Sequence, residues 1–528
     1  MTAMPKVLIA DELSSAAVQV FRNRGVEVDE KVGLKPKELR DIIGVYDGLA
    51  VRSATKVTPE VIAVAKSLRV VGRAGIGIDN IDLKAATAAG ICVMNTPFGN
   101  SITTAEHAIA MMFACARQIP AADASTRAGK WEKSKFVGVE LYAKTLGLIG
   151  CGNIGSIVAD RAQGLKMKVI AYDPFLSPDR ALDLGVEKVE LDELYSRADF
   201  ISLHTPLTDQ TRGMINKDSL AKCRQGVRIV NCARGGLIVE DDLRAALESG
   251  HVGGAALDVF SEEPATTNVL FNHPHVVTTP HLGASSTEAQ LNVALQVAEQ
   301  MADFLLHGAV TNALNIPSVT VEEAPRLRPY LKLAEQLGSF AGQVTEDPIK
   351  RIVVEYEGHA ATLNIKPLTG TILQAVLRGS LDNVNMVNAA HIAKERDIEV
   401  SEMRTEREGD YHTLIRLTVE TDHFTRDIAG TLFAEKRPRL VQIKGINVDA
   451  ELGPHMLYVT NEDKPGMIGN LGSTLGDNKI NIATFALGRS APGQDAIALI
   501  EIDGPIPAPV LEKVRKLPNV RQAKALVF

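Results

Sequence analysis

The stretch TLGLIGCGNIGSIVADRAQGLKMKVIAYD, residues 145–173, decides the fold of the first half of the chain. An apolar, strand-like segment leads into a turn in which Gly150, Gly152 and Gly155 open a helical segment, and a second apolar segment ends at Asp173. Glycine at these positions permits a tight turn, close backbone approach to a pyrophosphate and close helix packing. A carboxylate about 20 residues further on accepts hydrogen bonds from a ribose 2′-OH, which favours NAD over NADP. The stretch therefore predicts a dinucleotide site, and a merely structural tight turn is the alternative.

Apolar segments alternate with helical ones on both sides of this stretch, the pattern of open parallel sheets covered on both faces. One series, KVLIA, GLAVR, VVGRAG and CVMN, precedes residue 98, and a second series runs from residue 145 to residue 282. Between them a helix is expected from Thr103 to about Arg127. We predict an α/β fold with two doubly wound parallel-sheet (Rossmann-like) domains joined by a hinge. Residues 1–98 and 282–317 form the substrate-binding domain, and residues 99–281 form the dinucleotide-binding domain.

The second half of the chain has a different character, because no further glycine-rich phosphate turn follows Pro317. The strand-like segments RIVVEYEG, HTLIRLTVE and VQIKGINV occur with helical stretches between them. They predict an α+β domain over residues 318–453. Residues 454–528 follow the order strand, helix, strand, strand, helix, strand, which predicts a ferredoxin-like domain.

Composition and charge exclude several classes of function. The 528 residues exceed what one hydrophobic core serves, and a formal charge of −7 gives no long-range attraction to nucleic acid or anionic lipid. No apolar stretch approaches the ~20 residues that cross a bilayer, and the N-terminal run, broken at Asp11 and Glu12, is unlike a signal peptide. We expect a cytoplasmic protein. No Cys-x-x-Cys pair occurs, so neither disulfides nor a metal site are expected from Cys92, Cys115, Cys151, Cys223 and Cys232.

Three polar residues follow apolar segments of the second series, at the edge where such a sheet exposes its ligand crevice: Arg234, Glu263 and His281. Oxidation of a secondary alcohol needs a base for the hydroxyl proton, and a histidine suits this role. A carboxylate beside it stabilises the imidazolium, and an arginine binds a substrate carboxylate through two parallel hydrogen bonds. Taken singly, the three residues could be a surface ion pair, a loop charge and a helix cap. Together, after a dinucleotide turn, they predict a catalytic set.

The runs KCRQGVRIVNCARGGLIVEDDL (222–243), ALDVFSEEP (256–264) and TTPHLGAS (278–285) resemble the D-isomer-specific 2-hydroxyacid dehydrogenase family. The resemblance extends from about residue 5 to residue 317 and implies an NAD-dependent enzyme with Arg234, Glu263 and His281 as catalytic residues. Glu263 is preferred to Glu262 because the family places the acid immediately before the proline. Asp258 has an alternative role as a turn cap. The implied cofactor-binding residues are Gly150, Gly152, Asn153, Ile154, Gly155, Asp173, Thr205, Cys232, Ala233, Arg234, Asp258, His281, Leu282, Gly283 and Ala284.

The loops after the first-domain segments carry the residues expected to bind the substrate, together with Arg234: Arg52, Ser53, Arg73 and Asn100. Two arginines in a chain without net positive charge indicate a compact anion site such as one for phosphate, with structural ion pairs as the alternative. The motifs resemble the branch of the family that oxidises 3-phosphoglycerate to 3-phosphohydroxypyruvate, the first step towards serine. Ile76 departs from relatives that carry a polar residue there. Another D-2-hydroxyacid dehydrogenase, such as a glyoxylate or hydroxypyruvate reductase, and an NAD-sensing regulatory protein are the competing interpretations.

The run LYVTNEDKPGMIGNLGSTLGDNKINIATF, residues 457–485, is similar to ACT domains, which bind amino acids at paired domain interfaces. The resemblance implies an effector site formed by Asn461, Asp463 and Asn481, with Asn481 lying across from the first strand-to-helix loop. Residues 318–453 resemble the intervening domain of the same branch. L-serine is then the expected feedback inhibitor, and a homo-oligomer, as a tetramer, the expected assembly. A domain that only dimerises is the alternative.

Overall fold

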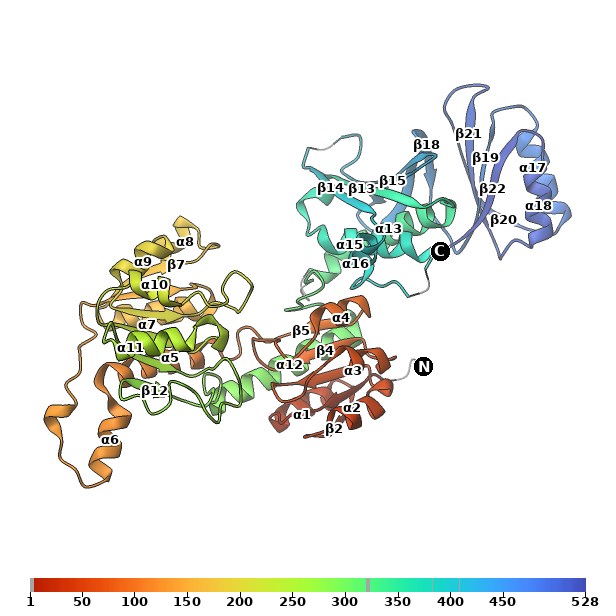
Figure 1. Cartoon of the computed structure of the whole chain (residues 1–528). Helices are drawn as coiled ribbons and strands as arrows, with labels where there is room; N and C mark the ends of the chain where they lie inside the picture. The colour runs from red at the N-terminus through yellow and green to blue at the C-terminus, as the bar shows by residue number, and fades with distance from the viewer. Residues whose placement is uncertain (1–3, 320–322, 382, 408) are drawn as a thin grey trace.

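The computed structural model describes residues 4–528 except 320–322, 382 and 408, and its first sheet has five parallel strands in the order β2-β1-β3-β4-β5 (Figure 1). Strand β2 (Glu27–Glu30) was not expected, because the sequence EVDE is largely charged and lies at the sheet edge. The other strands are β1 (Lys6–Ile9), β3 (Gly48–Val51), β4 (Val70–Arg73) and β5 (Cys92–Met94). The helices of this part are α1 (Ser15–Asn23), α2 (Pro36–Ile42), α3 (Pro59–Val64) and α4 (Leu83–Ala88).

The second sheet has seven parallel strands in the order β12-β11-β10-β9-β6-β7-β8. The strand order reverses between β6 and β9, and such a switch point is where doubly wound sheets bind ligands. The strands are β6 (Thr145–Ile149), β7 (Lys168–Tyr172), β8 (Glu187–Lys188), β9 (Phe200–Leu203), β10 (Val227–Asn231), β11 (Val252–Leu257) and β12 (Val276–Thr278). The helices are α7 (Asn153–Gly164), α8 (Pro178–Asp183), α9 (Leu191–Arg197), α10 (Lys217–Lys222) and α11 (Glu240–Glu248). Two doubly wound sheets are as predicted.

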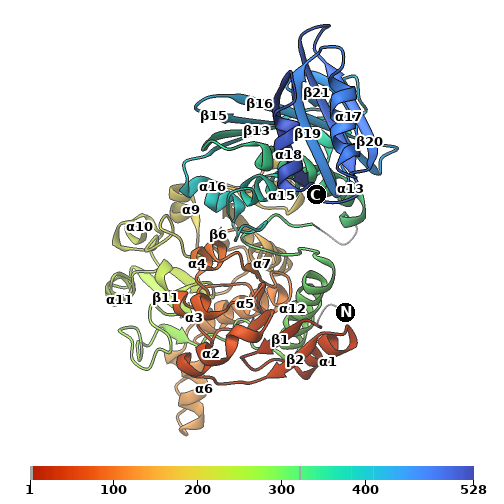
Figure 2. The same ribbon diagram turned by 90° about the vertical axis from the view of Figure 1, so that its right-hand side faces the viewer.

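The helix expected between the two sheets is two helices, α5 (Ser101–Arg117) and α6 (Ile119–Arg127). Gln118 between them adopts a left-handed backbone with φ of 52°. Helix α6 begins at Ile119, and Pro120 lies in its first turn, where the missing N–H of proline is tolerated. Helix α5 buries one face in the core of the second sheet. Helix α6, all of which the structure describes, buries none of its residues and projects from this domain (Figures 1 and 2).

Helix α12 (Thr287–His307) returns the chain to the first sheet, so the chain crosses between the two sheets twice. Val297 and Met301 of α12 lie in the same core as β1 and β4. A Cβ atom added to Gly72 in β4 would lie 2.2 Å from the Met301 sulfur, so this close contact requires glycine. The two crossings are the structural basis for the predicted hinge.

The intervening part contains a mixed six-stranded sheet in the order β14-β13-β15-β16-β17-β18, with α13 and α15 in its core. The segment VQIKGINV, expected as one strand, is a hairpin whose turn lies at Lys444 and Gly445, both with positive φ. The helices are α13 (Ala324–Val344), α14 (His359–Thr362), α15 (Lys366–Arg378) and α16 (Ala389–Glu395). The strands are β13 (Ile349–Gly358), β14 (Glu399–Thr405), β15 (Thr413–Thr421), β16 (Thr425–Phe433), β17 (Arg437–Ile443) and β18 (Ile446–Ala450).

The last part is an antiparallel sheet in the order β20-β21-β19-β22 covered by α17 and α18, the ferredoxin-like arrangement that the sequence predicts. Its first strand-to-helix loop ends at Gly466, whose φ is 94°. The strands are β19 (His455–Glu462), β20 (Ile482–Arg489), β21 (Asp495–Ile502) and β22 (Val520–Val527). The helices are α17 (Met467–Asp477) and α18 (Ala508–Arg515).

Hydrophobic cores run across the boundaries between the later domains. Phe340 of α13 packs edge-on against Tyr458 of β19, with ring centroids 5.3 Å apart, within one core that spans the intervening and last sheets. Val387, just before α16, lies in the core of the first sheet, and Asn385 donates a hydrogen bond of 2.8 Å to the Gly90 carbonyl. The second half is therefore packed onto the first-sheet domain. The domain boundaries themselves remain our prediction. Among the described residues, no helix has both the length and the apolar character needed to span a bilayer.

Candidate active site

The polar residues predicted for the site lie where strands of the two sheets end. Gly150 follows β6, Asp173 follows β7 and Thr205 lies just beyond β9, on either side of the switch point. On the same edge, Arg234, Glu263 and His281 follow the adjacent strands β10, β11 and β12. Parallel strands present their carboxyl ends at one edge, so one crevice collects residues that are far apart in the sequence.

The glycine-rich turn has the space that a dinucleotide needs. Gly150 has φ of 93°, and a Cβ on Gly155 would lie 2.2 Å from the Gly150 carbonyl oxygen, so both positions require glycine. Gly152 caps the N-terminus of α7, and a Cβ there would meet nothing within 4 Å among the described atoms, which leaves open space beside unsatisfied helix N–H groups. Asp173 accepts hydrogen bonds of 2.8 Å from the Cys151 and Phe175 amides, so its carboxylate is held beside the turn. These residues fit an NAD molecule.

His281 and Glu263 form a hydrogen-bonded pair, with His281 Nδ1 2.7 Å from Glu263 Oε2. The other carboxylate oxygen of Glu263 accepts a hydrogen bond of 3.0 Å from the Phe260 amide. Burial acts to raise the pKa of Glu263, but the hydrogen bonds from His281 and Phe260 outweigh it and hold the pKa below its ordinary value. Because Nδ1 faces the carboxylate, Nε2 of His281 is the nitrogen available to a substrate. Glu263 rather than Glu262 makes this contact.

The turn that carries His281 is fastened to Asp258, whose side chain is fully buried at the end of β11. Asp258 accepts hydrogen bonds from the Leu282 amide (2.7 Å), the Gly283 amide (2.8 Å) and the Thr279 hydroxyl (2.6 Å). Burial acts to raise the pKa of Asp258, yet these hydrogen bonds and one from a histidine keep it below the ordinary value. The carboxylate therefore holds the backbone that follows His281 and the Thr279 side chain that precedes it, and His281 itself has φ of 57°.

Three arginines converge at the crevice from the two sheet edges. Arg73 at the end of β4 is largely buried, and its Nε has no hydrogen-bond partner among the described residues. Burial, followed by the charges of Arg234 and Arg52, lowers the pKa of Arg73 to about 10. A buried guanidinium placed beside two further cations is unfavourable unless an anion joins them. The carboxylates of Asp79 and Asp11 act on the Arg73 pKa in the opposite direction. Asn100 is buried at the first crossing, and its Oδ1 has no hydrogen-bond partner among the described residues.

Arg234 lies against the glycine loop that follows β4. Its Nε donates a hydrogen bond of 3.0 Å to Asp79, and its Nη1 donates one of 2.7 Å to the Ala233 carbonyl. A Cβ on Gly77 would lie 1.7 Å from Arg234 Nη2, so only glycine leaves room for this guanidinium. Arg234 is therefore pre-positioned between the two sheets with Nη2 directed at the loop.

The remaining predicted residues also follow strand ends or lie in the same turns. Asn153 and Ile154 open α7, Cys232 and Ala233 follow β10, and Ala284 follows Gly283 in the His281 turn. Burial raises the pKa of Cys232 above its ordinary range, so this residue stays a thiol. Ser53 is exposed after β3, beside Arg52, whose amide donates a hydrogen bond of 2.6 Å to the buried Asp11.

The residues predicted for an effector site do not come together within one chain, which corrects the expectation that Asn481 lies across from the loop. Asn461 pairs in register with Ala496, whereas Ile482, next to Asn481, pairs with Ile502, so the two asparagines are at opposite ends of the sheet. Asp463, expected to hold an amino group, is ion-paired with Arg489 at 2.8 Å. Asn461 is buried, and its Oδ1 has no partner among the described residues.

Several residues at the site were not found from the sequence. His107 and Thr104 on α5, Thr279 before His281, and Asp79 beside Arg234 all make side-chain contacts within the crevice or beneath it. The only sequence signal for Thr279 is its place two residues before His281. The sequence around His107 does not distinguish it from an ordinary surface or core residue of a helix. Their roles depend on contacts between distant segments.

Comparison with known proteins shows which families the domains of the chain resemble. The model of the D-isomer specific 2-hydroxyacid dehydrogenase NAD binding domain matches residues 109–283, the D-3-phosphoglycerate dehydrogenase intervening domain matches residues 326–444, and the ACT domain matches residues 455–519. D-3-phosphoglycerate dehydrogenase of Bacillus subtilis is 41% identical over 525 residues, covering 99% of each chain. The enzyme of that name from a Synechocystis species is 43% identical over 522 residues, covering 98% of this chain and 94% of that one.

A solved structure shares the fold of the first half. The crystal structure of cofactor (NAD+)-bound 3-phosphoglycerate dehydrogenase from Entamoeba histolytica is 31% identical, with a TM-score of 0.51, and covers 59% of this chain and 99% of that one. Fold, site and NAD-binding domain together define an NAD-dependent dehydrogenase of D-2-hydroxy acids. Within that class, the chain belongs to the D-3-phosphoglycerate dehydrogenase family.

Proposed function

We propose that this chain oxidises D-3-phosphoglycerate to 3-phosphohydroxypyruvate with NAD, the first step of serine biosynthesis from that acid. The observation that carries the proposal is the convergence of Arg52, Arg73 and Arg234, with Arg73 largely buried and its pKa lowered. A substrate with one carboxylate and one phosphate supplies the two anionic groups that such a cluster requires. The enzymes of Bacillus subtilis and Synechocystis with which the chain aligns over nearly its full length carry the same name.

The reaction distributes a proton and a hydride between two acceptors. His281 takes the proton of the C2 hydroxyl at Nε2, while Glu263 holds Nδ1–H and stabilises the imidazolium that forms. A bound NAD would supply the acceptor for the hydride that leaves C2, so that the alcohol would become the ketone, with NADH and a proton as the other products. Arg234 binds the substrate carboxylate through its guanidinium, and Arg52 and Arg73 bind the phosphate. Closure of the two sheet domains about their crossings excludes water from this crevice.

The residues proposed to bind NAD have distinct tasks. The amides at the start of α7 bind the pyrophosphate, and Asp173 accepts hydrogen bonds from the adenosine ribose. The nicotinamide end of NAD lies beside the switch point, near Thr205, Cys232 and Ala233.

All five cysteines are free thiols, which supports the proposal that the enzyme works in a reducing compartment, the cytoplasm.

The substrate assignment is tested by reducing NAD with D-3-phosphoglycerate, D-glycerate or D-lactate as the only alcohol. D-Glycerate is the matched control because it lacks only the phosphate. We expect D-3-phosphoglycerate to have by far the highest kcat/KM. Equal values for the first two acids would remove the phosphate-site argument and favour a reductase of small keto acids. Binding of NADH with no turnover of any acid would favour an NAD-sensing regulatory protein.

We further propose that L-serine inhibits the enzyme at a site shared by the last domains of two chains in a homotetramer. Asn461 and Asn481 lie at opposite ends of the sheet. Asn461 pairs with Ala496, and Ile482, next to Asn481, pairs with Ile502; the seven residues from Ala496 to Ile502 span about 20 Å, so one small ligand reaches both asparagines only across two chains. The unpartnered Oδ1 of the buried Asn461 supports a polar ligand there.

A mixing experiment tests the shared site. Asn461→Ala and Asn481→Ala variants should each keep kcat and lose serine inhibition. When equal amounts of the two variants are mixed and reassembled, about half of the pairs are hybrids and each hybrid pair regains one site with both asparagines, so about a quarter of the inhibition should return if the site spans two chains. No recovery, with hybrid assembly shown by native mass spectrometry, would place both residues in separate or single-chain roles.

A further inference from the structure

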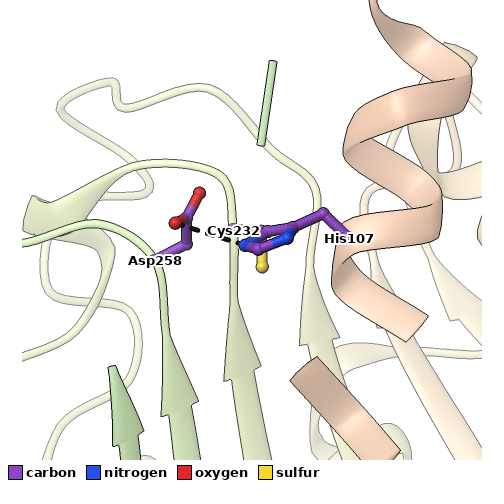
Figure 3. A group of neighbouring side chains, drawn as sticks. All are labelled: His107, Cys232 and Asp258. Carbon is purple, nitrogen blue, oxygen red and sulfur yellow. Dashed lines mark ion pairs between the residues drawn. The ribbon is translucent and has the colours of Figure 1, made fainter. Parts of the chain in front are cut away.

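Helix α5 reaches beneath the turn that carries His281. His107, in the second turn of α5, lies with Nε2 3.3 Å from Asp258 Oδ1 and 3.3 Å from the Thr279 hydroxyl. Figure 3 shows the His107 ring extending from its helix across the strand ends, beside Cys232, to the Asp258 carboxylate. Because the ionised carboxylate can only accept, Nε2 carries the hydrogen of this contact.

Two further contacts tie α5 to the same turn. Thr104 Oγ1 donates a hydrogen bond of 2.8 Å to the Gly283 carbonyl, and Thr103 Oγ1 lies 3.2 Å from Ser286 Oγ at the start of α12. Helix α5 follows the first crossing between the sheets and α12 makes the second. The segment from Thr279 to Ser286 is thus held from one side by the helix that leads out of the hinge.

The grouping of His107, Cys232 and Asp258, whose potential ligand atoms lie within 4.8 Å of one another, does not fit a metal ion. Burial raises the pKa of Cys232 above its ordinary range, whereas a metal site requires the thiolate. The Asp258 oxygens already accept hydrogen bonds from two backbone amides and a hydroxyl. The group is a hydrogen-bond junction.

We infer that His107 is a positioning residue for His281, a role that rests on the function proposed above. His281 holds a left-handed backbone that residues other than glycine seldom adopt, so the turn keeps this shape only while its surroundings enforce it. Asp258 enforces it through Leu282 and Gly283, and His107 fixes the orientation of that carboxylate and of Thr279. His107 thus sets where His281 Nε2 stands when the proton moves.

The test compares three substitutions at one position. His107→Leu removes the donor, His107→Gln keeps a donor where Nε2 stands, and His107→Asn is too short to reach it. We expect kcat for the leucine and asparagine variants to fall about tenfold to 100-fold, the scale of a small misplacement of a reacting group. We expect the glutamine variant to retain most of kcat, and the KM for the acid and the Kd for NADH to stay within about twofold in all three.

The inference would be overturned if His107→Leu had the kcat of the wild type, or if His107→Gln were as slow as His107→Leu. A loss confined to NADH affinity would instead assign the junction to cofactor binding and also overturn it. Failure of the proposed function is distinguishable, because then the unsubstituted enzyme itself would not turn over. His251→Leu is the matched control, since it removes a partly buried imidazole with two hydrogen bonds elsewhere in the same domain and should leave kcat unchanged.

Thr279→Val is a second test if His107→Leu folds poorly, because it removes the Thr279 hydroxyl that contacts His107 Nε2 and Asp258. Melting temperatures of all variants separate a folding defect from misplacement. The double variant should be no slower than the slower single variant, since both substitutions break one junction. Fully multiplied losses would show that the two residues act independently and would contradict the inference.

Discussion

The carboxyl edges of the two parallel sheets differ in how far the protein itself satisfies their polar groups. On the second sheet, Asp258 and Glu263 have hydrogen-bond donors on both carboxylate oxygens, from the backbone and from neighbouring side chains. On the first sheet, Arg73 keeps a buried Nε without a partner among the described residues and stands beside two other cations. The polar groups of the second-sheet edge are satisfied by the protein itself, as preorganised catalysis requires, and we propose that the anionic groups of the substrate satisfy those of the first-sheet edge.

The largest effect is expected on the complete edge, at the residue that takes the proton. His281→Ala should lower kcat by about 10²- to 10⁴-fold, the usual contribution of a general base, while NADH still binds. The measurement is steady-state kinetics together with NADH fluorescence titration. A variant that keeps a tenth or more of kcat would assign the base to another residue and erase the distinction between the two edges.

The second effect concerns the incomplete edge. Arg73→Ala should raise the KM for D-3-phosphoglycerate about 100-fold, because charge-assisted hydrogen bonds to the phosphate are lost, and should leave the KM for D-glycerate nearly unchanged. Arg69→Ala is the control, because Arg69 is an exposed arginine directly before β4, the strand that Arg73 ends. Equal increases for both acids would show that Arg73 binds the common carboxylate and not the phosphate.

A smaller loss is expected at Glu263, which acts on the substrate only through His281. Glu263→Gln should lower kcat about tenfold to 100-fold, because the amide neither stabilises the imidazolium nor fixes the tautomer of the ring. Glu262→Gln changes the neighbouring exposed carboxylate in the same way and should have no effect. If the two variants behaved alike, the hydrogen bond of 2.7 Å would have no catalytic consequence.

The smallest effect is on acid stability, through Asp258. Its pKa in the folded protein lies below the ordinary value of 3.8, so the unfolded chain binds a proton there at higher pH than the folded chain. The ionised carboxylate therefore stabilises the fold fully above about pH 4, and this contribution is lost as the pH falls through the lower folded pKa. Urea unfolding from about pH 6 down to about pH 3 should give a shallower pH dependence for Asp258→Asn than for wild type. Identical slopes would contradict the lowered pKa.

Much of this architecture could be predicted from the sequence because its signals are local. Three spaced glycines and Asp173 locate the dinucleotide turn, and the position of Glu263 before Pro264 selects the acid that contacts His281. Strand β2 was missed because EVDE has no apolar run, and the break at Gln118 was missed because glutamine is an ordinary helix residue.

Other features could not be read from the sequence because they depend on contacts between distant segments. His107 lies 151 positions from Asp258, and nothing near it in the sequence marks the junction that they share. The expected position of Asn481 was wrong for a different reason. Strands β19 and β20 both run antiparallel to β21, so the start of β20 lies at the end of the sheet opposite to the loop that follows β19.

The hydrophobic cores that continue across the boundaries of the intervening and last domains determine where the chain can be divided into separate fragments. The solved dehydrogenase structure from Entamoeba histolytica covers 59% of this chain and is itself covered to 99%, so that solved chain has no counterpart of the later domains. In this chain, Val387 of the intervening domain is buried in the core of the first sheet, and Tyr458 of the last domain packs against Phe340 of the intervening domain. A truncation at either of these two domain boundaries would therefore expose apolar core residues to solvent, and the catalytic fragment would carry an exposed apolar patch.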